Sequence, residues 1–241
     1  MQKSLILSSL LLLGVVMLAK VACCASTPAS VLENIHWFGQ AAVKIQAGET
    51  TIYIDPLQLE QTDPADIVLI THPHDDHLSV ADMTKVADDQ TVFIAPSACA
   101  EKVKQVAKTD MIVAEPGQTL TVGAIQIEVV PAYNVVKTKF HAKENHWVGY
   151  ILTLDGVRVY HTGDTERIPE MKNIRADIML LPLGQTYTMN SVQEAADAVL
   201  DVQAKIAIPI HYGLYEGTAA DAQAFSAALQ DKLQVVIKPN E

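Results

Sequence analysis

The sequence predicts an α/β (α+β) protein that folds as an αββα sandwich of two mixed β-sheets flanked by helices. Two observations carry this prediction: short apolar strands open each of two similar halves of the chain, and helical periodicity follows them in both. The chain has 241 residues, of which 49% are hydrophobic and 19% are charged. These values indicate a folded globular protein rather than a disordered one.

The first half begins with strands. We expect three short ones at 35–38, 42–46 and 51–55. Residues 67–71 form a short, continuously apolar run, which is typical of a strand that is buried on both faces. Helices are expected at 79–87 and 97–107, with a strand at 91–95 between them. Gly117 and Gly123 bracket further short strands, the last of them at 125–130.

The second half repeats this order of strands and helices. Strands are expected at 147–154, 157–161, 178–181, 205–210 and 235–237. The Asp-Gly dipeptide at 155–156 favours a hairpin turn between the first two of them. A capping box at 191–194 opens a helix with one apolar face, and Thr218 caps a last helix that ends near Leu229.

The first 25 residues have the order of a secretory signal peptide. Lys3 precedes an uncharged run from Ser4 to Ala19, and small residues follow it. The run is shorter than the roughly 20 residues that a transmembrane helix needs. We therefore expect a signal peptide at 1–25, one folded domain at 26–241, and export to the periplasm or to the outside of the cell.

Two alternatives remain for this N-terminal segment. The run could stay uncleaved as a membrane anchor, with Lys20 directly after it. Cys23 or Cys24 could instead carry a lipid, as in bacterial lipoproteins, and a lipid anchor is then the expected membrane contact. Loss of residues 1–25 would leave Cys99 as the one cysteine, so no intramolecular disulfide is expected. Cys99 is expected to be a small buried residue.

The charge of the chain bears on its partners. The formal net charge is −11, and it becomes −13 once Lys3 and Lys20 are lost with the signal peptide. A field of this sign repels phosphate backbones, which argues against nucleic acid as the main partner. A small-molecule substrate is expected instead. Three lysines in one loop hint that it is anionic: Lys137, Lys139 and Lys143.

The segment His72-Pro73-His74-Asp75-Asp76-His77 carries the strongest functional signal. It follows an apolar strand directly, and loops at strand ends are where polar ligands converge without disrupting a core. Imidazoles and a carboxylate together suit zinc, and less selectively manganese or iron. Three histidines and an aspartate on one non-helical loop therefore predict a site for one or two metal ions.

This segment resembles the signature of the metallo-β-lactamase superfamily, and three further segments match in the expected order. Asp55-Pro56 ends the third strand, the run at 160–165 contains Gly163-Asp164, and the run at 209–213 contains His211. The resemblance covers residues 31–238. Its nearest subgroup is the small single-domain hydrolases, similar to ascorbate-phosphate lactonases and to the phospholipase D that acts on N-acyl ethanolamine lipids.

The resemblance implies a set of metal ligands. One ion would be held by His72 and His74. The other ion would be held by Asp76, His77 and His211, and Asp164 would bridge the two. The zinc site would supply a metal-bound hydroxide that attacks an ester, lactone or phosphodiester, with Asp76 also orienting the nucleophile.

The sequence departs from the family at one ligand. Most members supply a third histidine to the first ion after a strand in mid-chain, where this chain has Tyr133-Asn134. Either His141 or His146 returns to the site from the same loop, or the first ion is weakly held. We expect His141 near the site, as a ligand or as a substrate contact. Candidate donors to a developing oxyanion are Tyr133, His141, Tyr187 and Tyr212.

Two other functions remain open at this point. A non-catalytic periplasmic metal-binding protein would explain an incomplete first site. Oxygen chemistry at a di-iron centre would need an electron-carrying partner, for which about 216 mature residues leave little room. A metal-dependent hydrolase is the function that the pattern of ligands favours.

Overall fold

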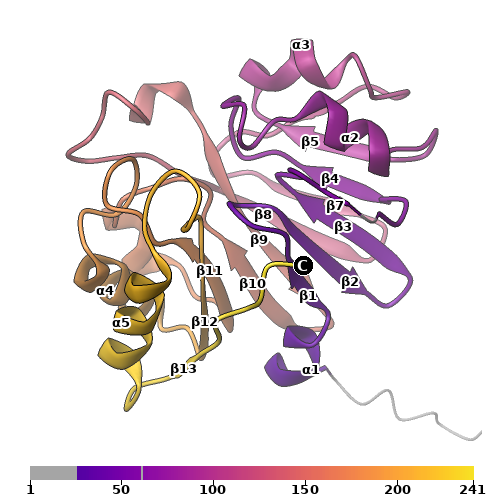
Figure 1. The fold of residues 1–241 in the computed structure, drawn as a ribbon. Coiled ribbons are helices and arrows are strands. Elements are labelled where there is room, and N and C mark those ends of the chain that lie inside the picture. The colour runs from indigo at the N-terminus through magenta and orange to yellow at the C-terminus, as the bar shows by residue number, and fades with distance from the viewer. Residues whose placement is uncertain (1–25, 61) are drawn as a thin grey trace, which may run out of the picture.

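The computed structural model describes residues 26–60 and 62–241, so the predicted signal peptide lies outside the described residues. Two sheets form the centre of the fold (Figure 1). The first sheet contains β1 (Ile35–Trp37), β2 (Val43–Ala47), β3 (Thr50–Ile54), β4 (Ile67–Leu69), β5 (Val92–Ala95) and β6 (Ile112–Val113). The second contains β7 (Thr119–Val122), β8 (Ile125–Pro131), β9 (Val148–Leu154), β10 (Val157–His161), β11 (Ile178–Pro182), β12 (Ile206–Ile210) and β13 (Gln234–Val235).

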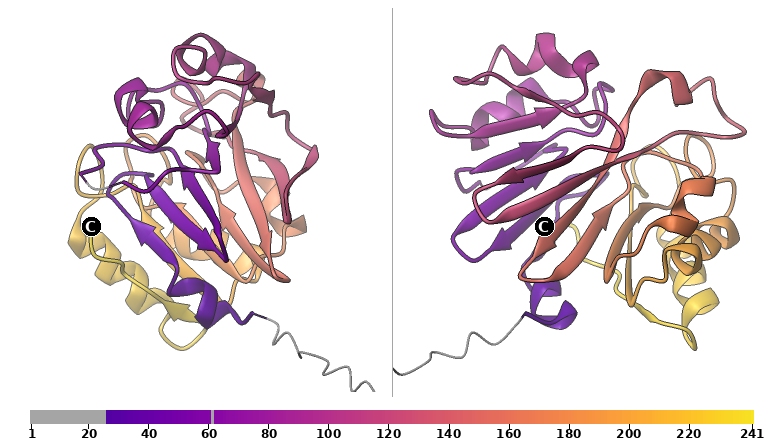
Figure 2. Two further views of the ribbon diagram at one scale, coloured as in Figure 1. Left: turned by 90° about the vertical axis from the view of Figure 1, so that its right-hand side faces the viewer. Right: turned by 180° about the vertical axis from the view of Figure 1, so that it is seen from behind.

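Each sheet begins with antiparallel pairs and continues with parallel ones. In the first sheet β1, β2 and β3 are antiparallel neighbours, and the pairs from β3 to β6 are parallel. In the second sheet β7 to β10 are antiparallel neighbours, and the pairs from β10 to β13 are parallel. Both sheets thus pass from antiparallel to parallel pairs, as the repeated pattern predicts, but β7 and β8, which the sequence places with the first half, belong to the second sheet. Figure 2 shows the two sheets from two further sides.

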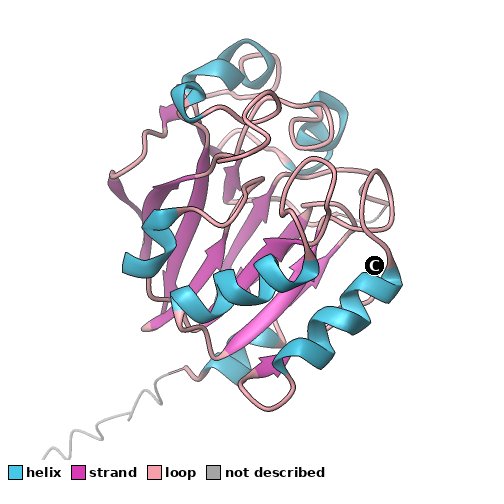
Figure 3. Cartoon of the chain, turned by 90° about the vertical axis from the view of Figure 1, so that its left-hand side faces the viewer, coloured by secondary structure: helices cyan, strands magenta, loops and turns pink. Residues whose placement is uncertain are grey.

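Helices cover the outer face of both sheets. The α-helices are α1 (Pro28–Leu32), α2 (Val80–Val86), α3 (Ala100–Val103), α4 (Val192–Val202) and α5 (Ala219–Leu229). The 3₁₀ helices are η1 (Ser97–Cys99), η2 (Lys143–Asn145) and η3 (Pro169–Asn173). In Figure 1, α2 and α3 lie on one side of the molecule and α4 and α5 on the other, and Figure 3 shows α4 and α5 crossing the second sheet. The predicted αββα sandwich is confirmed.

Strands β3 and β4 of the first sheet contribute side chains to two different cores, one on each face of the sheet. Ile52 and Ile54 of β3 belong to the core between the two sheets, whereas Tyr53 belongs to the core beneath α2 and α3. In the same way Leu69 points between the sheets, and Val68 points toward the helices. Successive side chains of a strand face opposite sides. A strand covered on both sides therefore needs the unbroken apolar run that the sequence shows at 67–71.

One predicted helix is shorter than expected. The segment 97–107 forms η1, the single α-helical turn of α3, and further turns. The amide N–H of Val106 donates to the carbonyl of Val103 at 2.9 Å, a bond that tightens the chain into a 3₁₀-like turn. Its buried side chains, Cys99 and Val103, still pack beneath the first sheet as predicted. No helix in the described ranges is long and apolar enough to cross a lipid bilayer.

The strands deliver the functional segments to one edge of the sandwich. Thr71 directly follows the β4 strand region, and its carbonyl accepts a hydrogen bond from the N–H of Val148 at 3.1 Å, which joins the two sheets there. Asp164 follows β10 and His211 follows β12, and these strands are linked in parallel register through β11. The carboxyl ends of parallel strands meet at one edge, so these three loops come together.

Candidate metal centre

The structure brings every predicted metal ligand into one cluster, together with His141. Three overlapping groups have ligand atoms within 4.8 Å of one another. They are His72, His74 and His141; then His72, His77 and Asp164; then Asp76, His77 and His211. The side chains come from four different loops, at the ends of β4, β8, β10 and β12. Each of these groups could hold a metal ion.

Asp164 lies at the centre of this cluster. Its Oδ2 atom is 3.2 Å from Nε2 of His211 and 3.4 Å from Nε2 of His77. The same oxygen is 3.4 Å from Nε2 of His141 and 4.0 Å from Nε2 of His72. Imidazoles from all three groups therefore face one carboxylate oxygen, which is the geometry that a bridging ligand needs.

Gly163 allows Asp164 to take this position. It has a φ of +62°, and a Cβ atom added there would lie 2.6 Å from the carbonyl oxygen of Val148. An L side chain is disfavoured in both respects. The Gly-Asp pair after β10 is thus explained by a left-handed turn packed tightly against the neighbouring strand.

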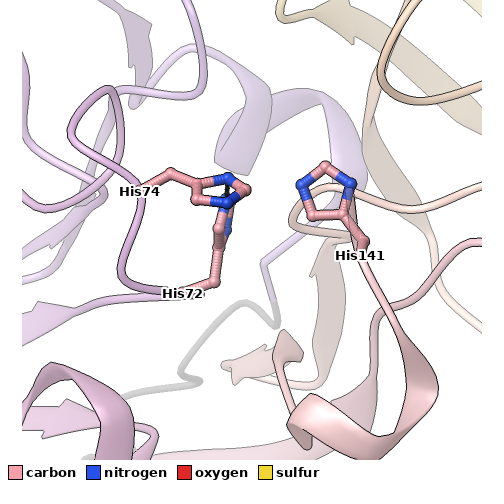
Figure 4. A group of neighbouring side chains, drawn as sticks. All are labelled: His72, His74 and His141. Carbon is pink, nitrogen blue, oxygen red and sulfur yellow. Dashed lines mark hydrogen bonds between the residues drawn. The ribbon is translucent and has the colours of Figure 1, made fainter. Parts of the chain in front are cut away.

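His141 is the histidine that joins His72 and His74 (Figure 4). It is 1% exposed, its Nδ1 contacts the Asn134 side-chain amide at 3.3 Å, and its Nε2 has no hydrogen-bond partner among the described residues. His146, by contrast, has a side chain that is 67% exposed and lies 3.4 Å from Glu115. Of the two histidines in the loop, His141 reaches the site and His146 faces solvent.

Buried carboxylates orient two of the imidazoles from behind. Asp55 Oδ2 lies 2.8 Å from Nδ1 of His77, and Glu216 Oε1 lies 3.0 Å from Nδ1 of His211, although the His211 N–H is poorly aligned with that oxygen. In both cases the Nε2 atom faces the cluster. Partners of this kind fix the ring and its tautomer in metal sites. The sequence signals Asp55 as part of a motif, but nothing in the local pattern at 212–217 signals Glu216.

Gln40 is a second residue that sequence reasoning misses. Its buried Nε2 lies 2.8 Å from Asp76 Oδ2 and 2.7 Å from His211 Nε2. Its backbone carbonyl accepts from the N–H of His211 at 2.7 Å, and both residues have positive φ values, 45° and 57°. Strained backbone of this kind clusters at functional sites. Gln40 precedes a strand in an otherwise apolar segment, so only the tertiary structure places it here.

The donor set fits divalent cations. His141 Nε2 and Asp164 Oδ1 are buried without a hydrogen-bond partner among the described atoms, and His72 Nε2 lies 3.0 Å from His74 Nδ1. Buried polar atoms are rarely left unpaired, because their desolvation is not compensated. A cation bound between these atoms would satisfy them, and imidazole with carboxylate is the mixture that zinc accepts.

The protonation states of the site also favour binding of a cation. Burial lowers the pKa of the His72 imidazole well below its ordinary value, so this ring is neutral and able to offer a lone pair. Burial also lowers the pKa of His77, but the negative charges of Asp164 and Asp55 outweigh it and raise that pKa to about 10. The buried carboxylates thus demand positive charge at this point, which either protons or metal ions can supply.

Tyr133, which the sequence offers as a donor to a developing oxyanion, does not lie at the metal centre. Its hydroxyl donates to Glu170 Oε2 at 2.8 Å and accepts from Lys143 Nζ at 3.2 Å. The side chain lies in a different hollow from the histidine cluster, so the structure does not bring this hydroxyl to the site. Tyr133 lies in the loop after β8, its ring packs in the core beneath α4, and the ion pair of Glu170 with Lys143 holds its hydroxyl there.

Other candidate residues also fall outside the cluster. Tyr212 stacks on Trp37 with ring centroids 5.1 Å apart. His36 pairs with Glu241, and His161 contacts the Ala41 carbonyl at 3.0 Å. Tyr187 does line the pocket over the metal centre.

An open pocket of about 340 Å³ gives access to the cluster. Its lining residues are His74, Asp75, Asp76, Phe140, His141, Asp164, Tyr187, His211 and Tyr215. The half-buried indole of Trp147 packs against His72 and His74, with ring centroids 4.9 and 4.8 Å away. The centre is therefore closed by an aromatic wall on one side and open to a small molecule on the other.

Two mixed sheets, with histidines and carboxylates converging at the strand ends, define a metal-dependent hydrolase of the αββα class. Comparison with known proteins agrees. The family model described as "Beta-lactamase superfamily domain" matches residues 34–211. A "UPF0173 metal-dependent hydrolase" of Archaeoglobus fulgidus is 31% identical, over 86% of this chain and 97% of the relative, and one of Methanoregula boonei is 35% identical over 82% and 90%.

Solved structures give the same result. A metal-dependent hydrolase of Parabacteroides distasonis has a TM-score of 0.74 and 35% identity, over 85% of this chain and 91% of its own. Igni18, described as a metallo hydrolase of Ignicoccus hospitalis, has a TM-score of 0.69 at 24% identity, over 86% and 95%, and shows the fold alone. The chain belongs to the metallo-β-lactamase superfamily and is a metal-dependent hydrolase.

Proposed function

We propose that this hydrolase uses two divalent cations, zinc before manganese or iron, to cleave an ester, a lactone or a phosphodiester. The observation that carries the proposal is the position of Asp164, whose Oδ2 lies within 4.0 Å of the Nε2 atoms of four histidines. A carboxylate shared between two groups of ligands is what a two-metal hydrolytic site requires.

The residues divide between the two cations by their distances. His72, His74 and His141 would hold one cation, and Asp76, His77 and His211 would hold the other, with Asp164 between them. A bound cation of this kind lowers the pKa of water toward neutrality and polarises the bond under attack. His141 then takes the place of the third histidine that most family members supply from the position of Asn134.

The chain itself contributes orientation and exclusion of water. Asp76 has a side chain that is 23% exposed and faces the pocket, so it is placed to orient an attacking water. The Gln40 amide holds that carboxylate from behind at 2.8 Å. Trp147 packs against the rings of His72, His74 and His141, which shields them from water on that side and strengthens the electrostatic interactions there.

The alternative is a non-catalytic metal-binding protein. It was suggested by the lack of a third histidine in the first group of ligands. With His141 next to His72 and His74, the reason for an incomplete first site is removed. The pocket that leads to Asp76 also gives a substrate a route to the centre. Catalysis is therefore the better account of the geometry.

The test combines metal content with turnover. We expect the purified chain to hold up to two equivalents of zinc by elemental analysis, and to hydrolyse at least one member of a panel of aryl esters, lactones and phosphodiesters. His74→Ala and Asp164→Ala should remove both properties. Tight metal binding with no turnover on the panel would favour the non-catalytic alternative, and absence of metal binding would refute the site.

Export remains part of the proposal. The order of residues at 1–25 supports a signal peptide, with a lipid anchor at Cys23 or Cys24 as the alternative. Mass spectrometry of the protein from fractionated cells decides between them. A new N-terminus at Ser26 supports secretion, a lipid-modified Cys supports anchoring, and an intact Met1 in the cytoplasm contradicts both.

A further inference from the structure

Aromatic side chains form the outer part of the pocket over the metal centre. Phe140, Tyr187 and Tyr215 line it together with the ligand side chains. Phe140 and Tyr187 meet edge to face, with ring centroids 4.9 Å apart. Pockets for small molecules combine apolar and aromatic walls with a few polar groups at the reacting centre. The pocket therefore has a polar end, formed by the metal ligands, and an aromatic end.

Exposed apolar side chains are concentrated around this pocket. Seven large hydrophobic side chains are exposed among the described residues. Five of them lie on the three loops that supply the aromatic lining, and of these Tyr187 and Tyr215 line the pocket itself: Val135, Val136, Tyr187, Leu214 and Tyr215. The other two, Val113 and Leu200, lie on β6 and α4. Apolar surface that is gathered at a cavity mouth indicates binding of an apolar group.

The backbone of these loops is fixed by buried carboxylates. Glu166 is fully buried and accepts hydrogen bonds from the N–H groups of Val135, Val136 and Lys137, at 2.7, 2.6 and 3.0 Å. The side chain of Glu216 accepts from the N–H of Tyr187 at 2.7 Å. These hydrogen bonds fix the backbone that carries Val135, Val136 and Tyr187, so their side chains project from ordered loops. A preorganised rim lowers the entropy lost when a ligand binds.

A hydrogen bond also joins the loop that contains Asn134 to the loop that contains Tyr187. The Asn134 side-chain amide donates to the backbone carbonyl of Tyr187 at 2.7 Å. Since Asn134 also contacts His141, the aromatic end of the pocket and the ligand end are parts of one hydrogen-bonded unit.

The charges of the pocket do not favour a large anionic group. None of the described residues that line it is a lysine or an arginine. Lys137 Nζ donates to the carbonyls of Gln185 and Met189, both at 3.1 Å, and Lys143 pairs with Glu170. Two of the three lysines of this loop therefore bind protein groups and do not line the pocket.

We propose that the substrate carries a neutral aromatic or branched apolar group, which packs against Phe140, Tyr187 and Tyr215 while the scissile bond lies beside Asp76. This inference rests on the proposed hydrolase function and names its substrate class. The volume of about 340 Å³ fits a small molecule with one such group.

A matched pair of hydroxamic acids tests the proposal without turnover, because a hydroxamate binds catalytic metal ions whatever its side group. The full chain loaded with zinc is titrated with acetohydroxamate and with phenylacetohydroxamate by calorimetry. We expect the phenyl compound to bind about tenfold tighter or more, since its ring leaves water for an aromatic wall. In the double variant Tyr187→Ala/Tyr215→Ala this preference should fall to less than about threefold.

Leu200→Ala is the matched control, because Leu200 is 38% exposed on α4 away from the pocket. It should keep the full preference. Circular dichroism confirms that the tyrosine variant is folded. Equal affinities for the two hydroxamates, or a preference that survives in the tyrosine variant, would overturn the apolar subsite and leave the hydrolase intact. Failure of both hydroxamates to bind a zinc-loaded chain would overturn the hydrolytic site and this inference with it.

Discussion

Asp55 lies directly behind His77, with 2.8 Å between Oδ2 of the carboxylate and Nδ1 of the imidazole, and both side chains are fully buried. The contact leaves Nε2 of His77 facing Asp164 and His211. Asp55 also accepts from the N–H and the hydroxyl of Thr71, at 2.8 and 2.6 Å, so it fixes the start of the histidine loop as well.

Asp55→Asn should therefore weaken metal binding although Asp55 is not a ligand. Replacing the carboxylate by an amide removes the charge that orients His77, and we expect about a 10–100-fold loss of zinc affinity. Competition against a chromophoric chelator measures it. Asp63→Asn is the control, because Asp63 pairs with Lys44 at the surface and has a side chain that is 64% exposed. An Asp55→Asn protein with the affinity of the wild type would contradict this role.

His141 and His146 offer a direct test of which histidine completes the first group. His141→Ala should release the cation held with His72 and His74 to a chelator at least about tenfold more readily, because one ligand of a buried site is lost. His146→Ala should bind metal like the wild type, since its side chain faces solvent. Zinc retained after dialysis reports both. If His146→Ala lost zinc and His141→Ala retained it, His146 would be the third ligand.

Gly184 makes room for the carboxylate of Glu216. A Cβ atom at this position would lie 1.8 Å from Glu216 Cδ, so Gly184→Ala forces the carboxylate away from His211 and from the N–H of Tyr187. We expect a loss of about 1–3 kcal/mol in the free energy of unfolding. In a Glu216→Ala background the same substitution should be nearly neutral, because the clash is gone. Urea unfolding of the four proteins gives the coupling, and additive effects would exclude the clash.

Cys99 should be chemically inert in the native protein. It is 0% exposed, and burial raises the pKa of its thiol to about 12. A group with a raised pKa stays protonated at pH 8, and the thiol form does not react with iodoacetamide. Peptide mapping by mass spectrometry should find Cys99 unmodified in the native chain and modified after unfolding in guanidinium. Rapid labelling of the native chain would show that this helix region opens.

Local pattern in the sequence determined the architecture and most of the donor set. The alternation and apolar runs predict the two halves of strands and helices because strand and helix periods are properties of neighbouring residues. The histidine loop is visible in the same way, whereas the roles of Asp164 and His211 are implied only by the resemblance of their segments to the metallo-β-lactamase signature. The shortened helix at 97–107 shows the limit, because element ends depend on packing.

Tertiary contacts decided the rest of the site. Whether His141 or His146 turns inward depends on Glu166, which holds the backbone of the loop from 29 to 31 residues away. Tyr133 faces Glu170 rather than the pocket because its backbone is hydrogen-bonded to Thr165 and its hydroxyl to Glu170, both more than 30 residues away along the chain. Gln40 meets His211 across 171 residues of chain. Such directions arise when distant segments pack together, and no local period in the sequence encodes them.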